Sequence, residues 1–253
     1  MIKSEIKTEN NFKYIEEGKG DVILLLHGLF GAISNWGHVL EKFSSNYRVI
    51  IPLIPIYELP LTQSNLKGLL EYLERFTKQF GLASFNLIGN SLGGHLALMY
   101  TIKNPTNVMR LVLTASSGLF ENSIGGSFPR RSNYDYVSER VGYTFFDPKT
   151  VDKTYIDEVF EVTSNAHKAI RVVSMAKSAQ RNNLEKELKE ITTKTLLIWG
   201  LNDTITPTMV AHEFNSLLKN SQLRFIDKCC HAPMMEHPQK FNEILDKFLQ
   251  QNK

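Results

Sequence analysis

The sequence predicts an α/β fold built on a mostly parallel, doubly wound sheet. Short apolar runs alternate along the chain with amphipathic stretches of helical spacing, which is typical of a parallel sheet covered by helices on both faces. Between about residues 117 and 191 the apolar runs disappear and helical patterns remain. We therefore expect an α/β core formed by residues 1–116 and 192–253, interrupted by a helical cap of residues 117–191.

The expected strands are short runs of apolar and β-branched residues that end at glycine, proline or polar residues. A strand buried on both faces reads as a continuous apolar run rather than as an alternating one. We expect strands at residues 21–26, 47–54, 84–89, 108–115, 195–200 and 222–227.

The expected helices show apolar residues at helical spacing and end at glycine or before proline. They cover residues 34–43, 66–80, 92–104, 208–218 and 238–248 in the core, and residues 155–161 and 168–180 in the cap. A cap over the carboxyl ends of parallel strands would roof the crevice in which such sheets bind ligands.

Length and composition narrow the classes of function. The chain has 253 residues, which is enough for one large domain with an insertion. The formal net charge is +3 and Lys and Arg form no dense run, so we expect no nucleic-acid partner. The N-terminal segment lacks the apolar centre of a signal peptide, and no apolar stretch approaches the roughly 18 residues of a membrane span. We expect a cytoplasmic protein with a small-molecule substrate and no membrane span, and leave a homodimer open.

The two cysteines, Cys229 and Cys230, are adjacent in the chain. Neighbouring cysteines seldom form a disulfide because the ring is strained, and a reducing compartment fits this usage. No second Cys or His cluster has the spacing of metal ligands, so we expect neither a metal nor another cofactor.

The strongest motif is Gly89-Asn90-Ser91-Leu92-Gly93, which lies between an expected strand and an expected helix. This context is typical of a nucleophile elbow, in which a strained turn lifts a serine hydroxyl above the sheet. Small residues two positions before and after the serine let strand and helix approach each other, and the helix N-terminus favours developing negative charge. We predict that Ser91 is a nucleophile rather than the N-cap of an ordinary turn.

A serine nucleophile needs a base and a carboxylate that orients the base. His231 lies on a loop after the last expected strand, and Asp203 follows the strand at 195–200. The chain order Ser91, Asp203, His231 is the order found with an elbow of this type. Asp227 is the alternative acid, and His27 is expected to brace the loop that follows the first strand.

The loop His27-Gly28-Leu29-Phe30-Gly31 can direct a backbone N–H at a substrate oxygen. We predict the Leu29 N–H as one oxyanion donor, with Phe30 in reserve, and the Leu92 N–H as the other. An apolar substrate pocket is expected to be lined by Phe30, Phe120, Phe128 and Met234, although some of these side chains can instead pack the cap onto the core.

These motifs together resemble the α/β-hydrolase superfamily over nearly the whole chain. The resemblance rests on HGLFG, GNSLGG, WGLND and CCHAPMMEHP, the last with Cys230 where the superfamily often has glycine. It implies a serine hydrolase with a Ser91–Asp203–His231 triad, oxyanion donors at Leu29 and Leu92, no cofactor, and a helical cap inserted after the sixth strand.

Within the superfamily, the G-N-S-x-G-G pattern resembles the meta-cleavage-product hydrolases, which split carbon–carbon bonds in dienol acids. Two features depart from that subfamily: HGLFG has few glycines, and Phe160 stands where its cap usually has an arginine. Other arginines that could replace it are Arg130, Arg131, Arg171 and Arg181. We expect a hydrolase of small to medium carboxylic esters with an apolar acyl or alcohol group; the alternatives are carbon–carbon bond hydrolysis and a receptor-like protein with little turnover.

Overall fold

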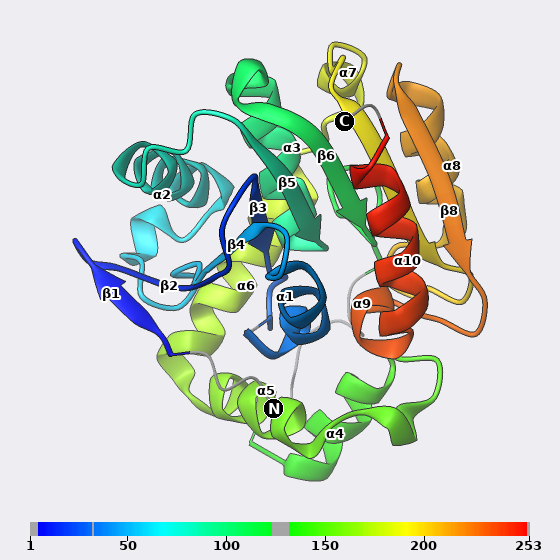
Figure 1. The fold of residues 1–253 in the computed structure, drawn as a ribbon. Coiled ribbons are helices and arrows are strands. Elements are labelled where there is room, and N and C mark those ends of the chain that lie inside the picture. Colours follow the sequence, from blue (N-terminus) through cyan, green and yellow to red (C-terminus); the bar gives the residue numbers. More distant parts are fainter. Residues whose placement is uncertain (1–4, 32, 123–131, 252–253) are drawn as a thin grey trace.

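The computed structural model describes residues 5–31, 33–122 and 132–251, which form an eight-stranded, mostly parallel sheet with helices on both faces (Figure 1). The strand order is β1-β2-β4-β3-β5-β6-β7-β8. The six strands from β4 to β8 in this order are parallel, and β1 and β2 are antiparallel additions at one edge. The strands are β1 (Lys7–Glu9), β2 (Phe12–Glu17), β3 (Val22–Leu26), β4 (Arg48–Pro52), β5 (Phe85–Asn90), β6 (Val108–Thr114), β7 (Lys194–Gly200) and β8 (Ser221–Ile226).

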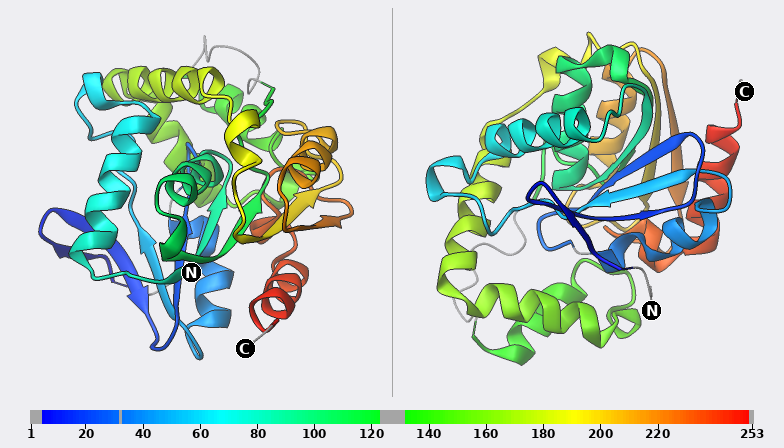
Figure 2. Two further views of the ribbon diagram at one scale, coloured as in Figure 1. Left: turned by 90° about the horizontal axis from the view of Figure 1, so that it is seen from above. Right: turned by 60° about the vertical axis from the view of Figure 1, so that its left-hand side comes forward.

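Alternate residues of the central strands pack into two separate hydrophobic layers. Along β3, Leu24 and Leu26 face one cluster of buried side chains, whereas Ile23 and Leu25 face the other. The first cluster includes residues of α2 (Leu66–Gln79), α3 (Leu92–Lys103) and α8 (Thr208–Leu217), and the second includes residues of α1 (Gly37–Phe43) and α10 (Pro238–Leu249). Figure 2 shows these two groups of helices on opposite faces of the sheet.

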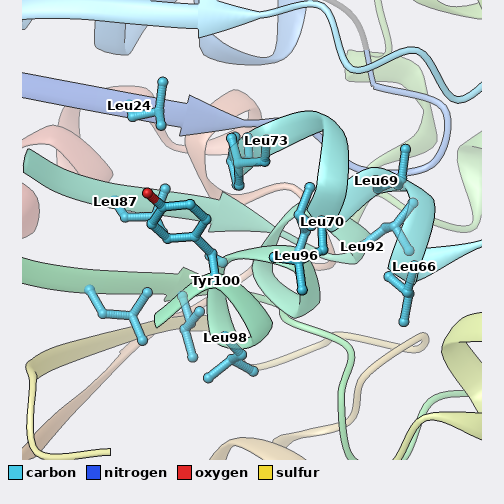
Figure 3. Close-up of a cluster of buried hydrophobic side chains, with 14 of the residues drawn as sticks. Leu24, Leu66, Leu69, Leu70, Leu73, Leu87, Leu92, Leu96, Leu98 and Tyr100 are labelled. Carbon is cyan, nitrogen blue, oxygen red and sulfur yellow. The ribbon is translucent and has the colours of Figure 1, made fainter. Parts of the chain in front are cut away.

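Figure 3 shows part of the first cluster, where the apolar side of α2 meets α3 and the sheet. Leu66, Leu69, Leu70 and Leu73 follow helical spacing along α2 and are buried. Asn65 caps the helix, because its side chain accepts a hydrogen bond from Gly68 N at 3.0 Å. The apolar stripe and the cap together explain why the sequence predicts this helix closely.

Within the described residues between β6 and β7 lie the α-helices α4 (Tyr134–Gly142), α5 (Lys153–Ser164), α6 (Ala166–Arg181) and the short α7 (Glu185–Leu188). In Figure 1, α4 and α5 lie beyond the arrowheads of β5 and β6, at the carboxyl ends of the parallel strands. The insertion thus follows the sixth strand and lies over the edge of the sheet where ligands are expected. The domain boundaries at 116/117 and 191/192 stay a prediction.

The structure contains elements that the sequence analysis did not predict. Strands β1 and β2 form a hairpin whose turn residues, Asn10 and Asn11, have φ of 47° and 67°. Asn-Asn in this conformation is a recognisable hairpin turn, but the flanking strands are too polar to read as buried runs. Helix α4 was also missed, although Asn133 caps it and Val137 and Val141 are buried at helical spacing.

None of the helices in the described part of the chain combines the length and the apolar character needed to cross a bilayer.

Candidate active site

The turn between β5 and α3 holds Ser91 in a strained backbone conformation. Ser91 has φ 54° and ψ −120°, a region that non-glycine residues rarely adopt. The turn is fixed on both sides, because Ser91 N donates to Thr114 O on β6 at 3.1 Å and Ser91 O accepts from His95 N at 3.1 Å. The sequence-predicted elbow is therefore present, with Ser91 directly before the first turn of α3.

Glycines on both sides of Ser91 allow the elbow to pack tightly. A Cβ added at Gly89 would overlap Gly93 O, and one added at Gly93 would overlap the carbonyl oxygens of Leu26 and His27. Strand β5, helix α3 and the end of β3 therefore meet backbone to backbone around the Ser91 turn.

We predict that Gly93→Ala destabilises the protein by about 1–3 kcal/mol, because the new methyl group must displace the backbone at the end of β3. Chemical denaturation followed by circular dichroism measures this change. Gly81→Ala is the reference for the backbone effect alone: Gly81 has φ 61° but no atom within 4 Å of an added Cβ, so it should lose only the cost of a left-handed alanine, about 1–2 kcal/mol. Gly93 does not have a positive φ, so a loss in Gly93→Ala reports the steric overlap. Equal stability of Gly93→Ala and the wild type would contradict this packing.

The ring of His231 pairs with the carboxylate of Asp203. His231 Nδ1 lies 3.0 Å from Oδ2 and 3.2 Å from Oδ1 of Asp203, whose side chain is fully buried. Asp203 Oδ1 also accepts from Ile205 N at 2.8 Å and Thr206 N at 2.9 Å, and Oδ2 accepts from Thr206 Oγ1 at 2.9 Å. The rival acid, Asp227, is exposed and accepts a hydrogen bond from the neighbouring Lys228 N.

The elbow is linked directly to the histidine loop. Asn90, the residue before Ser91, donates through Nδ2 to His231 O at 3.2 Å and to Thr114 O at 3.1 Å. Asn90 is buried, so these bonds replace contacts with water. The amide of Asn90 thus places the backbone of His231 beside the strand that carries Ser91.

Two opposing effects act on the pKa of His231. Burial acts to lower it, and the Asp203 carboxylate, which is both a nearby charge and a hydrogen-bond partner, acts to raise it. The charges of Glu121 and Glu236 also raise it, and the net result is a pKa above the ordinary value of 6.5. His231 is therefore a stronger base than a free imidazole.

Glu236, in the CCHAPMMEHP motif, braces the histidine loop. Its Oε1 accepts from Cys230 N at 2.8 Å and from Ala232 N at 3.4 Å, the two residues that flank His231. Its Oε2 accepts from Phe146 N, in the cap, at 2.7 Å. The carboxylate of Glu236 therefore links the backbone on both sides of His231 to the inserted segment. The sequence analysis did not assign this role to Glu236.

Cysteine is accommodated at position 230 without backbone strain. Cys230 does not have a positive φ, so the glycine of the family pattern is not required at this position. Both Cys229 and Cys230 are buried free thiols, and burial raises the pKa of each. Because the thiolate is the reactive form, neither sulfur is poised for nucleophilic or redox chemistry.

The loop after β3 lies against Ser91 and is braced by His27. A Cβ added at Gly28 would lie 3.2 Å from Ser91 Cβ, so the loop passes in contact with the elbow. His27 Nε2 accepts from Ile54 N at 3.1 Å, and its Nδ1 lies 2.9 Å from Gly28 O. This pattern requires a neutral ring with the proton on Nδ1, and burial indeed lowers the pKa of His27.

The two predicted oxyanion donors belong to segments that adjoin Ser91: Leu92 follows it in the chain, and Leu29 follows Gly28, whose added Cβ would lie 3.2 Å from Ser91 Cβ. Leu92 is the first residue of α3, where backbone N–H groups have no partner within the helix. The Leu29 N–H belongs to the same peptide group as Gly28 O, which accepts from Gly31 N at 3.0 Å and lies 2.9 Å from His27 Nδ1, so these contacts fix its orientation. Tyr57 OH donates to Leu29 O at 2.7 Å and fixes the next peptide, which carries the reserve donor, the Phe30 N–H. The oxyanion role of both N–H groups stays a prediction.

The side chains predicted to line an apolar substrate pocket differ in how far they are exposed to solvent. Phe30 is partly buried, and Phe120 is 50% exposed. Met234 is 1% exposed and belongs to the buried cluster that contains Trp36, so it does not line an open surface. Phe128 lies outside the described residues.

The arginines considered as substrate anchors have different surroundings. Arg171 donates to Leu59 O at 2.8 Å and to His167 O at 3.0 Å. Arg181 borders a groove between α2 and α6, and Arg130 and Arg131 are not described.

Glu121 is a site residue that the sequence analysis missed. It lies on the segment after β6 and is partly buried. Burial raises the pKa of Glu121, and the nearby charge of His231 lowers it in part. No sequence motif marks this residue; only the fold brings it near His231.

Within the residues that the structure describes, no three His, Cys, Asp or Glu side chains are grouped so that they could hold a metal ion.

The elbow, the parallel sheet and the insertion after the sixth strand define the class of protein. The family model described as "alpha/beta hydrolase fold" matches residues 21–160, and the chain belongs to this family.

The relatives extend over nearly the whole chain. A 2-hydroxy-6-oxononadienedioate/2-hydroxy-6-oxononatrienedioate hydrolase of Paraburkholderia xenovorans is 25% identical over 272 residues, covering 95% of this chain and 91% of the relative. A monoacylglycerol lipase of Xenopus laevis is 22% identical and covers 98% of this chain and 82% of its own length. The crystal structure of an α/β hydrolase enzyme from the sediment metagenome of the Mar Chica lagoon, Morocco, is 37% identical with a TM-score of 0.80, covering 97% of this chain and 98% of the other. Hydrolase activity is thus supported for this chain, whereas the relatives differ in the bond that their names say they cleave.

Proposed function

We propose that this protein is a serine hydrolase that cleaves carboxylic esters through an acyl-enzyme on Ser91. The observation that carries the proposal is the link between the strained serine and the histidine loop. Asn90 joins the elbow to His231 O at 3.2 Å, and the ring of His231 is paired with the buried Asp203 at 3.0 Å. A strained serine, a histidine and a buried carboxylate on neighbouring strand ends are the parts required for nucleophilic acyl transfer.

In the proposed mechanism, His231 accepts the proton of Ser91 through Nε2 while Ser91 Oγ attacks the ester carbonyl. Asp203 holds the proton on Nδ1 and stabilises the imidazolium that forms. The Leu29 and Leu92 N–H groups stabilise the oxyanion. His231 then protonates the leaving alcohol, and a water molecule, activated by the same imidazole, releases the acid from Ser91.

Carbon–carbon bond hydrolysis is the second candidate, because the relative from Paraburkholderia xenovorans is named for a dienedioate substrate. Esters are favoured because the arginine usual in the cap is replaced by Phe160, which packs edge-on against Tyr134 with ring centroids 5.2 Å apart. Arg171, on the neighbouring α6, is occupied with backbone carbonyls.

A substrate panel tests the proposal. We would measure kcat/KM for p-nitrophenyl esters graded by acyl length and for dienol acids of the meta-cleavage type. Ester turnover well above that of the dienol acids is the expected result. Turnover of dienol acids alone would support the second candidate, and absence of turnover on both classes would favour a receptor-like protein.

The pH dependence follows from the role of His231. Only neutral imidazole can accept the Ser91 proton, so kcat/KM should fall about tenfold per pH unit below the pKa of His231. Because Asp203, Glu121 and Glu236 raise this pKa, the midpoint should lie above 6.5. A pH–rate profile of ester hydrolysis measures it, and a flat profile between about pH 5 and pH 8 would contradict the assignment of His231 as base.

A further inference from the structure

The segment that follows β6 runs along one side of the Ser91 site. It begins at the nucleophile, because Ser117 N and Ser117 Oγ both donate to Ser91 O, at 3.2 and 3.3 Å. It then reaches the loop that carries Asp203, where Asn122 N donates to Ile205 O at 2.7 Å. Residues 117–122 therefore span from the serine to the acid loop and border the site.

This bordering segment is held firmly at its far end. Asn122 Nδ2 makes a second bond, to Thr204 O, at 2.9 Å. Thr204 Oγ1 in turn donates to Tyr143 O of the cap at 3.0 Å. Glu121, directly before Asn122, is thus fixed beside the acid loop rather than carried on a free strand end.

Glu121 brings a carboxylate to this border. Its side chain is partly buried, and His231 is the charged group that acts on it. The effect is mutual, since the charge of Glu121 also acts on His231. The backbone places the residue there independently: Asn122 N donates to Ile205 O at 2.7 Å, and Ile205 N donates at 2.8 Å to Asp203 Oδ1, on the carboxylate that pairs with His231.

We propose that Glu121 is a specificity-determining residue, which gives the border of the Ser91 site a negative charge and makes the site select neutral or cationic esters over esters that carry a carboxylate. This inference rests on the proposed ester hydrolysis and specifies its substrate class. A substrate carboxylate near His231 would meet the Glu121 carboxylate in a partly buried place, where like charges repel more strongly than in water. A quaternary ammonium group at the same place would be attracted.

The test compares three p-nitrophenyl esters of similar length and different charge. The neutral one is the heptanoate, the anionic one is the half ester of adipic acid, and the cationic one is the trimethylammonio-hexanoate. The assays are run at about pH 8 because burial raises the pKa of Glu121, and a higher pH favours its ionised form. We expect wild-type kcat/KM to fall in the order cationic, neutral, anionic.

The variant Glu121→Gln keeps the size of the side chain and removes its charge. It should raise the ratio of anionic to neutral kcat/KM roughly tenfold and lower the cationic-to-neutral ratio by a similar factor. The matched control is Glu190→Gln, which removes one negative charge from an exposed position after α7 and should leave both ratios unchanged. Ratios are used because they cancel any effect of either variant on stability or on the chemical step.

A second readout does not depend on turnover. An NMR titration of the His231 ring should give a lower pKa in Glu121→Gln than in the wild type, because one nearby negative charge is lost. Unchanged charge ratios in Glu121→Gln, with the wild type active on the neutral ester, would overturn the role of Glu121 alone. An unchanged pKa of His231 in Glu121→Gln would show that the Glu121 carboxylate is not close enough to His231 to act on it, and would overturn the electrostatic basis of the proposal. Lack of activity on all three esters would instead reject the proposed function, and the substrate class with it.

Discussion

Ser91→Ala should lower kcat/KM for a p-nitrophenyl ester by on the order of 10⁵-fold or more, with little loss of stability. The variant removes the atom that forms the acyl-enzyme, and neither His231 nor Asp203 can replace it. The fold should be kept, because the backbone bonds of Ser91 to Thr114 O and from His95 N do not involve its hydroxyl.

The measurement is steady-state ester hydrolysis, combined with thermal unfolding of the same samples. Ser216→Ala is the control, since Ser216 is exposed on α8 and bonds only locally to Glu213 O at 2.8 Å. Ester hydrolysis by Ser91→Ala within tenfold of the wild type would show that another residue is the nucleophile.

The second large effect is expected for Asp203→Asn, with a loss of about 10³- to 10⁴-fold in kcat/KM. Asparagine can keep one oxygen for the N–H groups of Ile205 and Thr206, at 2.8 and 2.9 Å in the wild type. Its amide nitrogen would then face His231 Nδ1 and donate to it. The proton of the ring would move to Nε2, so the imidazole could no longer accept a proton from Ser91.

The control for this variant is Asp227→Asn, which changes the rival carboxylate at the exposed end of β8. It should retain nearly full activity. Loss of activity in Asp227→Asn with retention in Asp203→Asn would reverse the assignment of the acid. A residual pH dependence in Asp203→Asn should have its midpoint below that of the wild type, because the charge that chiefly raises the pKa of His231 is gone.

The parts of the fold that could be predicted from sequence are those whose local pattern and burial agree. The strand at β5, the turn at Ser91 and the helix α3 follow from a buried apolar run, a glycine-flanked serine and a helix ended before proline. The β1–β2 hairpin at the sheet edge was missed, because an exposed edge strand lacks the apolar run by which buried strands are recognised.

In the candidate site, too, residues marked by a local motif could be predicted, and residues that depend on distant contacts could not. The turn at Ser91 and the pairing of His231 with Asp203 could be predicted because each residue follows a strand that carries a motif, and parallel strands bring their carboxyl ends to one edge. The catalytic roles of the three residues stay a prediction. Glu121 and Glu236 interact with residues 90 or more positions away in the chain, and Glu236 does so through a backbone N–H group, so no local pattern reveals these contacts. Met234, whose role in substrate binding stays a prediction, packs in the buried cluster that contains Trp36, and an apolar residue near the histidine reads the same in sequence whether it lines a pocket or the core.

The central claim, that Ser91 is the nucleophile activated by His231, is tested most directly by labelling with a fluorophosphonate and locating the adduct by mass spectrometry. Trypsin releases Ser91 in the peptide of residues 79–103, which also contains the exposed Ser84. The account predicts one adduct per chain, with fragment ions that place it on Ser91. An adduct on Ser84 or on another peptide, or an active enzyme that the probe leaves unmodified, would contradict it.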